Sequence, residues 1–212
     1  MIPYRDLNPT RTFPFFTLLL IAANIGVYVY QLSDPHHGLV FATVPANLWL
    51  VAHEHQWWPL ATLWTGTFLH AGFVHIFFNM LFLWVFGNNV EDQFGHFGFL
   101  GFYLLAALIA TLSQVAVSPH STMPIVGASG AISAVLGAYM ILYPRARVRT
   151  LFIIIIIPVV FELPAALVLS LWFAGQILSS LYGDPNGAGV AWYAHIGGFL
   201  FGMFAALLKG KR

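Results

Sequence analysis

Residues 97–117 read FGFLGFYLLAALIATLSQVAV, an apolar run of 21 residues without a charged side chain. A helix rises about 1.5 Å per residue, so a run of this length matches the ~30 Å hydrocarbon core of a bilayer. Further apolar runs lie on both sides of it. Across the chain of 212 residues, 59% are hydrophobic and 7% are charged, which is typical of a polytopic membrane protein.

Six apolar segments predict an all-α polytopic membrane protein with six transmembrane helices in one domain, residues 1–212. The predicted spans are approximately 15–32, 73–87, 97–117, 129–143, 164–182 and 190–208. The first run is longer than the apolar core of a secretory signal, about 7 to 15 residues, so we expect an uncleaved span.

The positions of the basic residues predict the membrane topology of these spans. All eight fall into three clusters: Arg5 and Arg11; Arg145, Arg147 and Arg149; Lys209, Lys211 and Arg212. Six spans place all three clusters on one side, which the positive-inside rule identifies as the cytoplasm. We therefore expect a multi-pass cell-membrane protein with both termini cytoplasmic. A seventh span after the second cluster would export the third, so residues 153–161 are expected to dip into the membrane or lie partly submerged.

A long first outer loop, residues 33–72, has no Lys or Arg and holds four of the seven tryptophans: Trp49, Trp57, Trp58 and Trp64. Indole rings prefer the boundary between lipid and water. We expect this loop to be associated with the membrane at the headgroup level.

Four polar side chains lie inside the predicted spans. His75 and Asn79 are four residues apart on one face of the second span, Ser129 opens the fourth and His195 lies in the last. Counting along each helix places them roughly 3 to 9 Å below the outer surface. Polar groups at this depth are costly and suggest function. Their shared depth predicts one site that opens to the outer face.

The chemistry of these residue types indicates acyl transfer. A serine hydroxyl needs a base to take its proton, and neutral histidine suits that role near pH 7. The oxyanion that forms needs donors, for which His75, Asn79 and the backbone N–H of Ser129 are candidates. No Asp or Glu lies at this depth, so a Ser129–His195 dyad is expected. Small residues predict close packing of the fourth and last helices: Ser129, Ser133, Gly137, Gly198 and Gly202.

Other site classes have weaker support. The chain has no cysteine, which excludes disulfides, cysteine nucleophiles and thiolate metal sites. A net charge of +1 gives no support for a nucleic-acid partner. The histidine clusters His36-His37 and His53-Glu54-His55 lack companion carboxylates at useful spacing, and no His-Glu-x-x-His occurs. We expect no metal and no cofactor.

Three motifs occur in order along the chain: His70-x4-His75-x3-Asn79, Gly127-Ala128-Ser129-Gly130 and Ala194-His195-Ile196-Gly197-Gly198. Together they resemble the rhomboid family of intramembrane serine proteases, and Glu91 stands where that family has an acidic residue. The resemblance implies a six-helix rhomboid-like core, with Ser129 as nucleophile, His195 as base, and His75 with Asn79 stabilising the oxyanion. It also implies single-span transmembrane substrates that enter past the fifth helix, near Trp172 and Phe173. Some members have tyrosine where this chain has Ser133, which leaves open what orients His195.

Two other functions remain as alternatives. A catalytically inactive relative would act as a membrane chaperone or client-binding protein, although such a relative would be expected to lose the serine or the histidine. A transporter or channel would use the buried histidines as a proton path. The transporter or channel alternative predicts no labelling of Ser129 by a serine-directed reagent.

Overall fold

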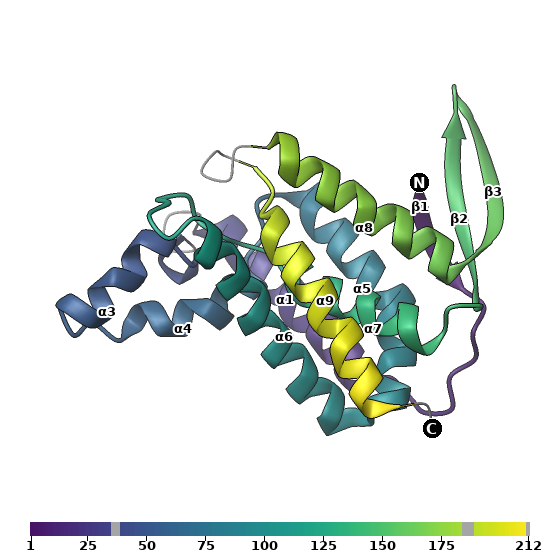
Figure 1. Ribbon diagram of the computed structural model, residues 1–212, viewed down its shortest axis with the longest axis horizontal. Helices are drawn as coiled ribbons and strands as arrows, with labels where there is room; N and C mark the ends of the chain where they lie inside the picture. The colour runs from purple at the N-terminus through teal and green to yellow at the C-terminus, as the bar shows by residue number, and fades with distance from the viewer. Residues whose placement is uncertain (35–38, 184–188, 211–212) are drawn as a thin grey trace.

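Six long helices make up most of the structure, a computed structural model that describes residues 1–34, 39–183 and 189–210 (Figure 1). Each coincides with a predicted span: α1 (Phe15–Ser33), α5 (Phe73–Phe94), α6 (His96–Val117), α7 (Ser129–Leu142), α8 (Ala165–Tyr182) and α9 (Trp192–Lys209). Four of them, α1, α5, α6 and α8, are long and apolar enough to cross a membrane. The fold is therefore that of a polytopic, mostly helical membrane protein.

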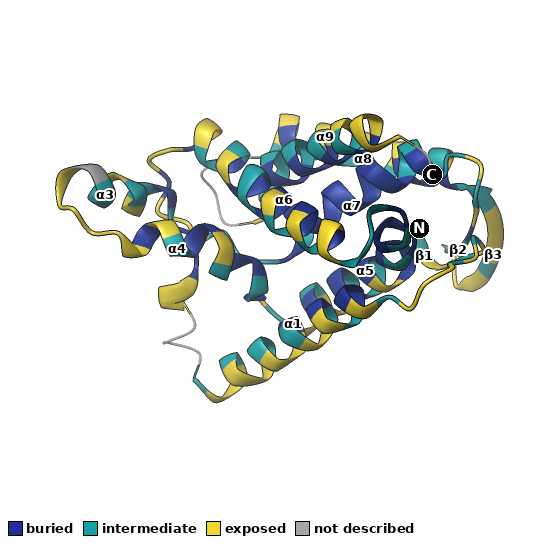
Figure 2. Cartoon of the chain, turned by 90° about the horizontal axis from the view of Figure 1, so that it is seen from below, coloured by how far each residue is buried: buried dark blue, intermediate teal, exposed yellow. Residues whose placement is uncertain are grey.

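Helix α7 lies at the centre of the bundle (Figure 2). Its residues from Gly130 to Tyr139 are all buried, because small and apolar side chains surround the whole helix. A helix that is apolar on every side belongs in the interior. Its 14 residues cover about 21 Å, which is shorter than the ~30 Å hydrocarbon core of a bilayer. Its first residue, Ser129, therefore lies below the level at which a full-length span would start.

Backbone contact joins α7 to α9. A Cβ atom added at Gly198 would collide with the carbonyl oxygen of Gly130, and one added at Gly202 would collide with that of Ala134. In the same way, Gly137 of α7 leaves room for the carbonyl of Phe199. The close approach predicted from the small residues is confirmed, and it brings the helices of Ser129 and His195 together.

A buried carboxylate holds the start of α1 against the end of α5. Glu91 is fully buried and accepts hydrogen bonds from the backbone N–H groups of Phe16 and Thr17 at 2.9 and 2.7 Å. The Thr17 hydroxyl donates a third bond at 2.7 Å, and Nδ1 of His96 lies 2.6 Å from the carboxylate. An acidic group at a helix N-terminus satisfies free N–H donors and suits the helix dipole.

The expectation of an all-α chain was wrong for residues 147–164. There β2 (Arg147–Ile154) and β3 (Ile157–Pro164) form an antiparallel hairpin, and β1 (Ile2–Asp6) pairs with β2 to make a three-stranded sheet of order β1-β2-β3. The segment is rich in β-branched isoleucine and valine, which favour strands, and prolines interrupt any helix. A search for long apolar runs, by which the spans were predicted, does not detect such a hairpin.

In the part of the first loop that the structure describes, residues 39–72, the helices are short: α3 (Trp49–His53), α4 (Trp58–Thr65) and the 3-10 turns η1 (Leu39–Phe41), η2 (Pro45–Leu48) and η3 (Gly66–Phe68). It extends from one side of the bundle, whereas the hairpin lies at the other (Figure 1). The indole N–H of Trp64 donates to the Leu104 carbonyl at 3.1 Å and ties the loop to α6.

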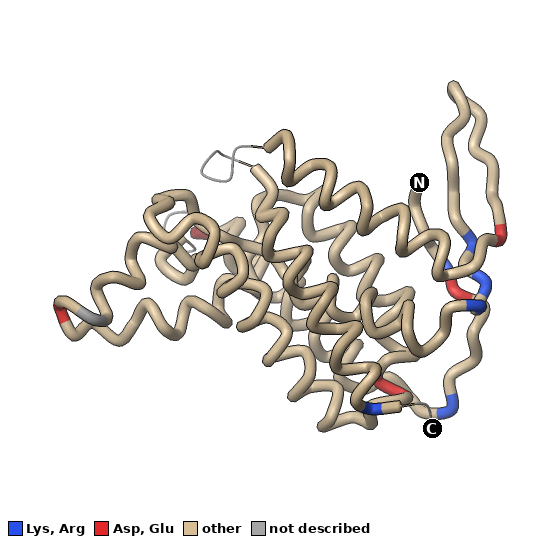
Figure 3. The backbone as a smooth tube through the Cα atoms, viewed as in Figure 1, with Lys and Arg blue, Asp and Glu red and all other residues tan. Residues whose placement is uncertain are grey.

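Lys and Arg residues lie along the chain near the end of the bundle where α5, α7 and α9 end (Figure 3). The described basic residues at this end include Arg145, Arg147, Arg149 and Lys209, while α5, α7 and α9 begin at the opposite end with the polar side chains described below.

Candidate active site

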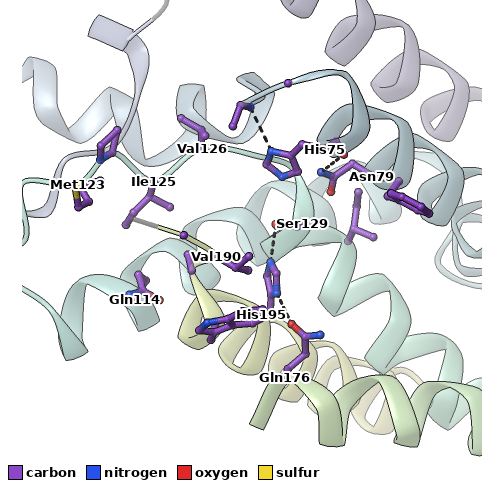
Figure 4. A pocket seen from close by; sticks show the side chains of 18 of the residues that line it. His75, Asn79, Gln114, Met123, Ile125, Val126, Ser129, Gln176, Val190 and His195 are labelled. Atoms are coloured by element: carbon purple, nitrogen blue, oxygen red, sulfur yellow. Dashed lines mark hydrogen bonds between the residues drawn. The ribbon is translucent and has the colours of Figure 1, made fainter. Parts of the chain in front are cut away.

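The structure brings Ser129 and His195 into hydrogen-bond contact (Figure 4). Ser129 is the first residue of α7, and His195 lies in the first turn of α9. The distance from Ser129 Oγ to His195 Nε2 is 2.7 Å. The helices can approach this closely because Gly198 lies one turn beyond the histidine. This is the nucleophile–base geometry that a serine hydroxyl requires.

Gln176 of α8 occupies the other side of the His195 ring. Its Oε1 lies 2.7 Å from His195 Nδ1. An amide oxygen can only accept, so Nδ1 carries the proton and Nε2 is left to accept the hydrogen bond from Ser129. The indole rings of Trp172 and Trp192 flank the imidazole, each with its centroid 6.1 Å away. These contacts answer the question of what orients His195 in a chain with Ser133 in place of tyrosine.

His75 faces the start of α7 from α5. Its Nδ1 accepts a hydrogen bond from the backbone N–H of Ala71 at 3.3 Å, which leaves the ring proton on Nε2. A Cβ atom built on Gly127 would lie 2.7 Å from His75 Nε2 and 3.7 Å from Ser129 Oγ. Gly127 has a φ of 115°, which favours glycine. Glycine at this position therefore lets the His75 donor point into the space beside the serine.

Asn79 is on the same face of α5, one turn further along. Its Nδ2 donates to the carbonyl of His75 at 3.0 Å. An amide nitrogen has two hydrogens, so one donor remains available to the cavity. The four residues that the sequence singled out for the site all line this cavity.

The cavity measures about 800 Å³. It lies between the start of α5, the start of α7, the segment 123–126 and the beginning of α9. One wall of the cavity is apolar, with Phe78, Phe82, Ile132 and Leu136. Its polar lining includes the groups around Ser129 and, from α6 and the segment that follows it, Gln114, Ser118 and Ser121. A cavity with an apolar wall and a few convergent polar groups fits a largely apolar ligand in which one polar group contacts the polar side chains.

The structure adds two residues, His70 and Gln176, to the surroundings of the predicted site. His70, which belongs to the first motif but has no predicted role in the catalytic set, is 3% exposed and packs edge-to-face on His75. Burial lowers its pKa to about 4, and the neighbouring His75 adds to this effect. Gln176 was missed, although an amide in an apolar helix is the same signal that identified Asn79.

The two aromatic residues of the fifth helix, α8, that were expected near the substrate entrance have different surroundings. Trp172 lines the cavity, whereas Phe173 stacks on Phe199 of α9 with a centroid distance of 4.2 Å. Of the loop histidines, His36 and His37 lie outside the described residues. In the ranges that the structure covers, no three His, Asp or Glu side chains are grouped to hold a metal ion.

Comparison with known proteins agrees with this architecture. A family model described as "Rhomboid domain" matches residues 54–212. Rhomboid protease GluP of Bacillus subtilis is 35% identical over 201 residues, covering 93% of this chain and 35% of the relative. Rhomboid protein 1, mitochondrial, of Saccharomyces cerevisiae is 30% identical over 147 residues, 65% of this chain and 38% of the relative. Rhomboid protease AarA of Providencia stuartii is 31% identical, covering 59% of this chain and 50% of the relative.

The chain thus spans between about a third and half of the length of these relatives. The family model, by contrast, covers three quarters of the chain and both helices that carry Ser129 and His195. The chain belongs to the rhomboid family.

Proposed function

We propose that this protein is an intramembrane serine endopeptidase that hydrolyses peptide bonds in or near transmembrane segments of other membrane proteins. The observation that carries the proposal is the 2.7 Å contact between Ser129 Oγ and His195 Nε2, with Nδ1 of the same ring held by Gln176. A serine in this setting has a base for its proton, and the base is held in the tautomer that can accept it.

The reaction follows from this geometry. Ser129 Oγ attacks the scissile carbonyl carbon while His195 Nε2 takes the hydroxyl proton. The imidazolium then gives that proton to the leaving amine, and an acyl ester on Ser129 remains. A water molecule, deprotonated by Nε2, attacks the ester, the carboxylic acid product leaves and the serine hydroxyl is restored.

The negative charge on the attacked oxygen needs donors. His75 Nε2–H and the free N–H of Asn79 both face the cavity beside Ser129. The backbone N–H groups at the start of α7 add to them, because Ala128 offers no side-chain cap. Donors held in place before the reaction stabilise an oxyanion most effectively.

The substrate and topology belong to the same proposal. Charge distribution favours six spans, a cell-membrane location, cytoplasmic termini, a headgroup-level first loop and an active site open to the outer face. The apolar cavity wall suits residues of a single-span transmembrane substrate that passes α8 beside Trp172. Such a substrate must unwind locally, because a helix keeps its carbonyls bonded within itself.

The test is cleavage of a model single-span substrate by purified protein in liposomes. We expect S129A and H195A each to abolish cleavage while the protein remains folded. S170A is the matched control, because Ser170 is an exposed helical serine that contacts Met140. A fluorophosphonate probe should label the wild type and S170A, but not S129A.

Cleavage that survives S129A would exclude this mechanism. If the wild-type protein binds the substrate without cleaving it and is not labelled by the probe, it is instead the inactive client-binding relative.

A further inference from the structure

The β2–β3 hairpin ends in five consecutive exposed isoleucines. Residues 153–157, here called the isoleucine tip, are between 52% and 91% exposed, with Ile155 at 91%. Successive residues of a strand point to opposite faces. Ile153 and Ile154 therefore lie on opposite faces, and both faces of the tip are apolar. A soluble hairpin keeps one face polar or covers it with protein.

Charge is confined to the other end of the hairpin. Arg149 Nε pairs with Glu162 Oε1 at 2.9 Å, and the guanidinium of Arg147 donates to the Glu162 carbonyl. Between Arg149 and Glu162 the sequence has no charged residue. With Arg145, these side chains form a charged base below an uncharged tip (Figure 3).

The turn itself uses residues that are unfavourable in water. Tight two-residue turns normally take Asn-Gly or Asp-Gly, because their backbone requires positive φ. Here the turn lies at Ile155 and Ile156, and Ile155 has a φ of 60°. A β-branched residue is strained in this region. An apolar surrounding would offset that strain by removing both side chains from water.

The direction of the hairpin places the tip beside the bundle. In the view of Figure 1, β2 and β3 extend upward from the charged base, as α8 does from Ala165. The tip thus lies on the same side of the base as the exposed apolar surface of α8, which includes Leu167 and Leu171.

We propose that the isoleucine tip inserts into the lipid leaflet next to the charged base, while Arg145, Arg147 and Arg149 lie at the headgroup phosphates. Lipid fits better than a protein partner because it surrounds both faces, whereas a groove covers one. Arginine is suited to phosphate oxygens, and anionic headgroups strengthen such contacts. The proposal concerns membrane attachment and is independent of catalysis.

The backbone limits the depth of insertion. β1 pairs with β2 only as far as Leu151, so beyond this residue both outer edges of the hairpin are open. Unpaired N–H and C=O groups are costly in hydrocarbon. Pro158 removes one donor from the edge, but the others need water or headgroups. The tip should therefore reach the boundary of headgroups and acyl chains, not the bilayer centre.

The absence of cysteine allows a direct test. The variants I153C, I154C and I156C, each labelled with an environment-sensitive fluorophore, are placed in nanodiscs of anionic lipid with one protein per disc. L171C, on an exposed part of α8, is the lipid control, and K209C at the end of α9 is the water control. Fluorescence is quenched with iodide in water or with spin-labelled lipids carrying the label near the headgroup or deep in the chain.

We expect all three tip labels to resist iodide and to lose fluorescence to the shallow lipid quencher more than to the deep one. The labels at 153 and 154 should behave alike, because lipid covers both faces. Labels that iodide reaches as readily as K209C would overturn the proposal. So would shielding of one face only, or shielding only when two proteins share a disc, since these results assign the tip to a protein contact.

Discussion

The α7–α9 pair and helix α8 supply the same site but are held in different ways. α7 and α9 meet through backbone contact at Gly198 and Gly202. On α8 only 22% of residues in its apolar stretch are buried, and Leu171, Leu178 and Leu181 face outward. The serine and the histidine thus come from a rigid pair, whereas the acceptor that orients the histidine comes from the loosely held helix. The position of His195, the proposed base, and the orientation of its ring therefore depend on different helices.

The largest effect should come from breaking the rigid pair. In G202V the new side chain collides with the Ala134 carbonyl, which is backbone, so rotation of a side chain does not relieve the contact. We expect a loss of stability well above the roughly 1–3 kcal/mol typical of overpacking, together with loss of cleavage because the two helices are forced apart. Thermal unfolding in detergent and the cleavage assay measure it. G175A is the matched control: the added methyl on α8 meets nothing within 4 Å, so stability should be kept or slightly raised.

A leucine pair compares the packing of the two regions directly. Leu142 on α7 is 3% exposed, whereas Leu171 on α8 is 53% exposed. We expect L142A to cost about 2–5 kcal/mol of unfolding free energy and L171A less than about 0.5 kcal/mol. Denaturant unfolding of both variants checks this. Equal costs would mean that α8 is held as firmly as α7.

Substitution of Gln176 separates orientation from position. In Q176L the ring of His195 loses its acceptor, and we expect kcat to fall by roughly 10- to 100-fold, a part of what general base catalysis provides. KM should change little. Q176E keeps an acceptor and should retain more activity than Q176L.

The pH profile of Q176E distinguishes this role from a merely structural one. A carboxylate beside the ring favours the protonated imidazole, so acidification should abolish cleavage at a higher pH than in the wild type. An unshifted acidic limb would argue that Gln176 only fills space.

The smallest effect concerns His70, which supports His75 on α5. Its pKa of about 4, set mainly by burial, lies below the ordinary value near 6.5. The stability from a neutral ring is therefore complete above about pH 6.5 and is lost as the pH falls toward 4. Between pH 7 and 5.5 this amounts to about 1 kcal/mol. H70F should flatten the thermal stability profile over that range, whereas H120F, at an exposed position, should not.

Much of this arrangement could be predicted from the sequence. Length and apolarity predicted helices where α1 and α5 to α9 lie, and the shared depth of Ser129, His195, His75 and Asn79 predicted that these residues lie together. Glycines at 198 and 202 predicted close packing, since only small residues allow such contact in lipid. These predictions succeed because they depend on local composition and spacing.

The parts that were missed depend on contacts between distant segments. The hairpin at 147–164 is stabilised by pairing, to which β1 from the other end of the chain contributes. The role of Gln176 follows from the way α8 meets α9, and the burial of His70 from the packing of its loop against Tyr28 and His75. The composition and spacing of residues along one segment contain none of this information.

Glu91 limits how far α1 can move along its own axis relative to α5. The outer face of α1 is apolar and meets acyl chains that are equally apolar, so lateral packing alone lets the helix slide along its axis at little cost. The bonds from Phe16, Thr17 and the Thr17 hydroxyl to one carboxylate remove that freedom. If α1 moved by one helical turn, the buried Glu91 carboxyl group would lose these hydrogen-bond donors. These bonds therefore fix the height of α1 relative to α5, the helix that also carries His75 and Asn79.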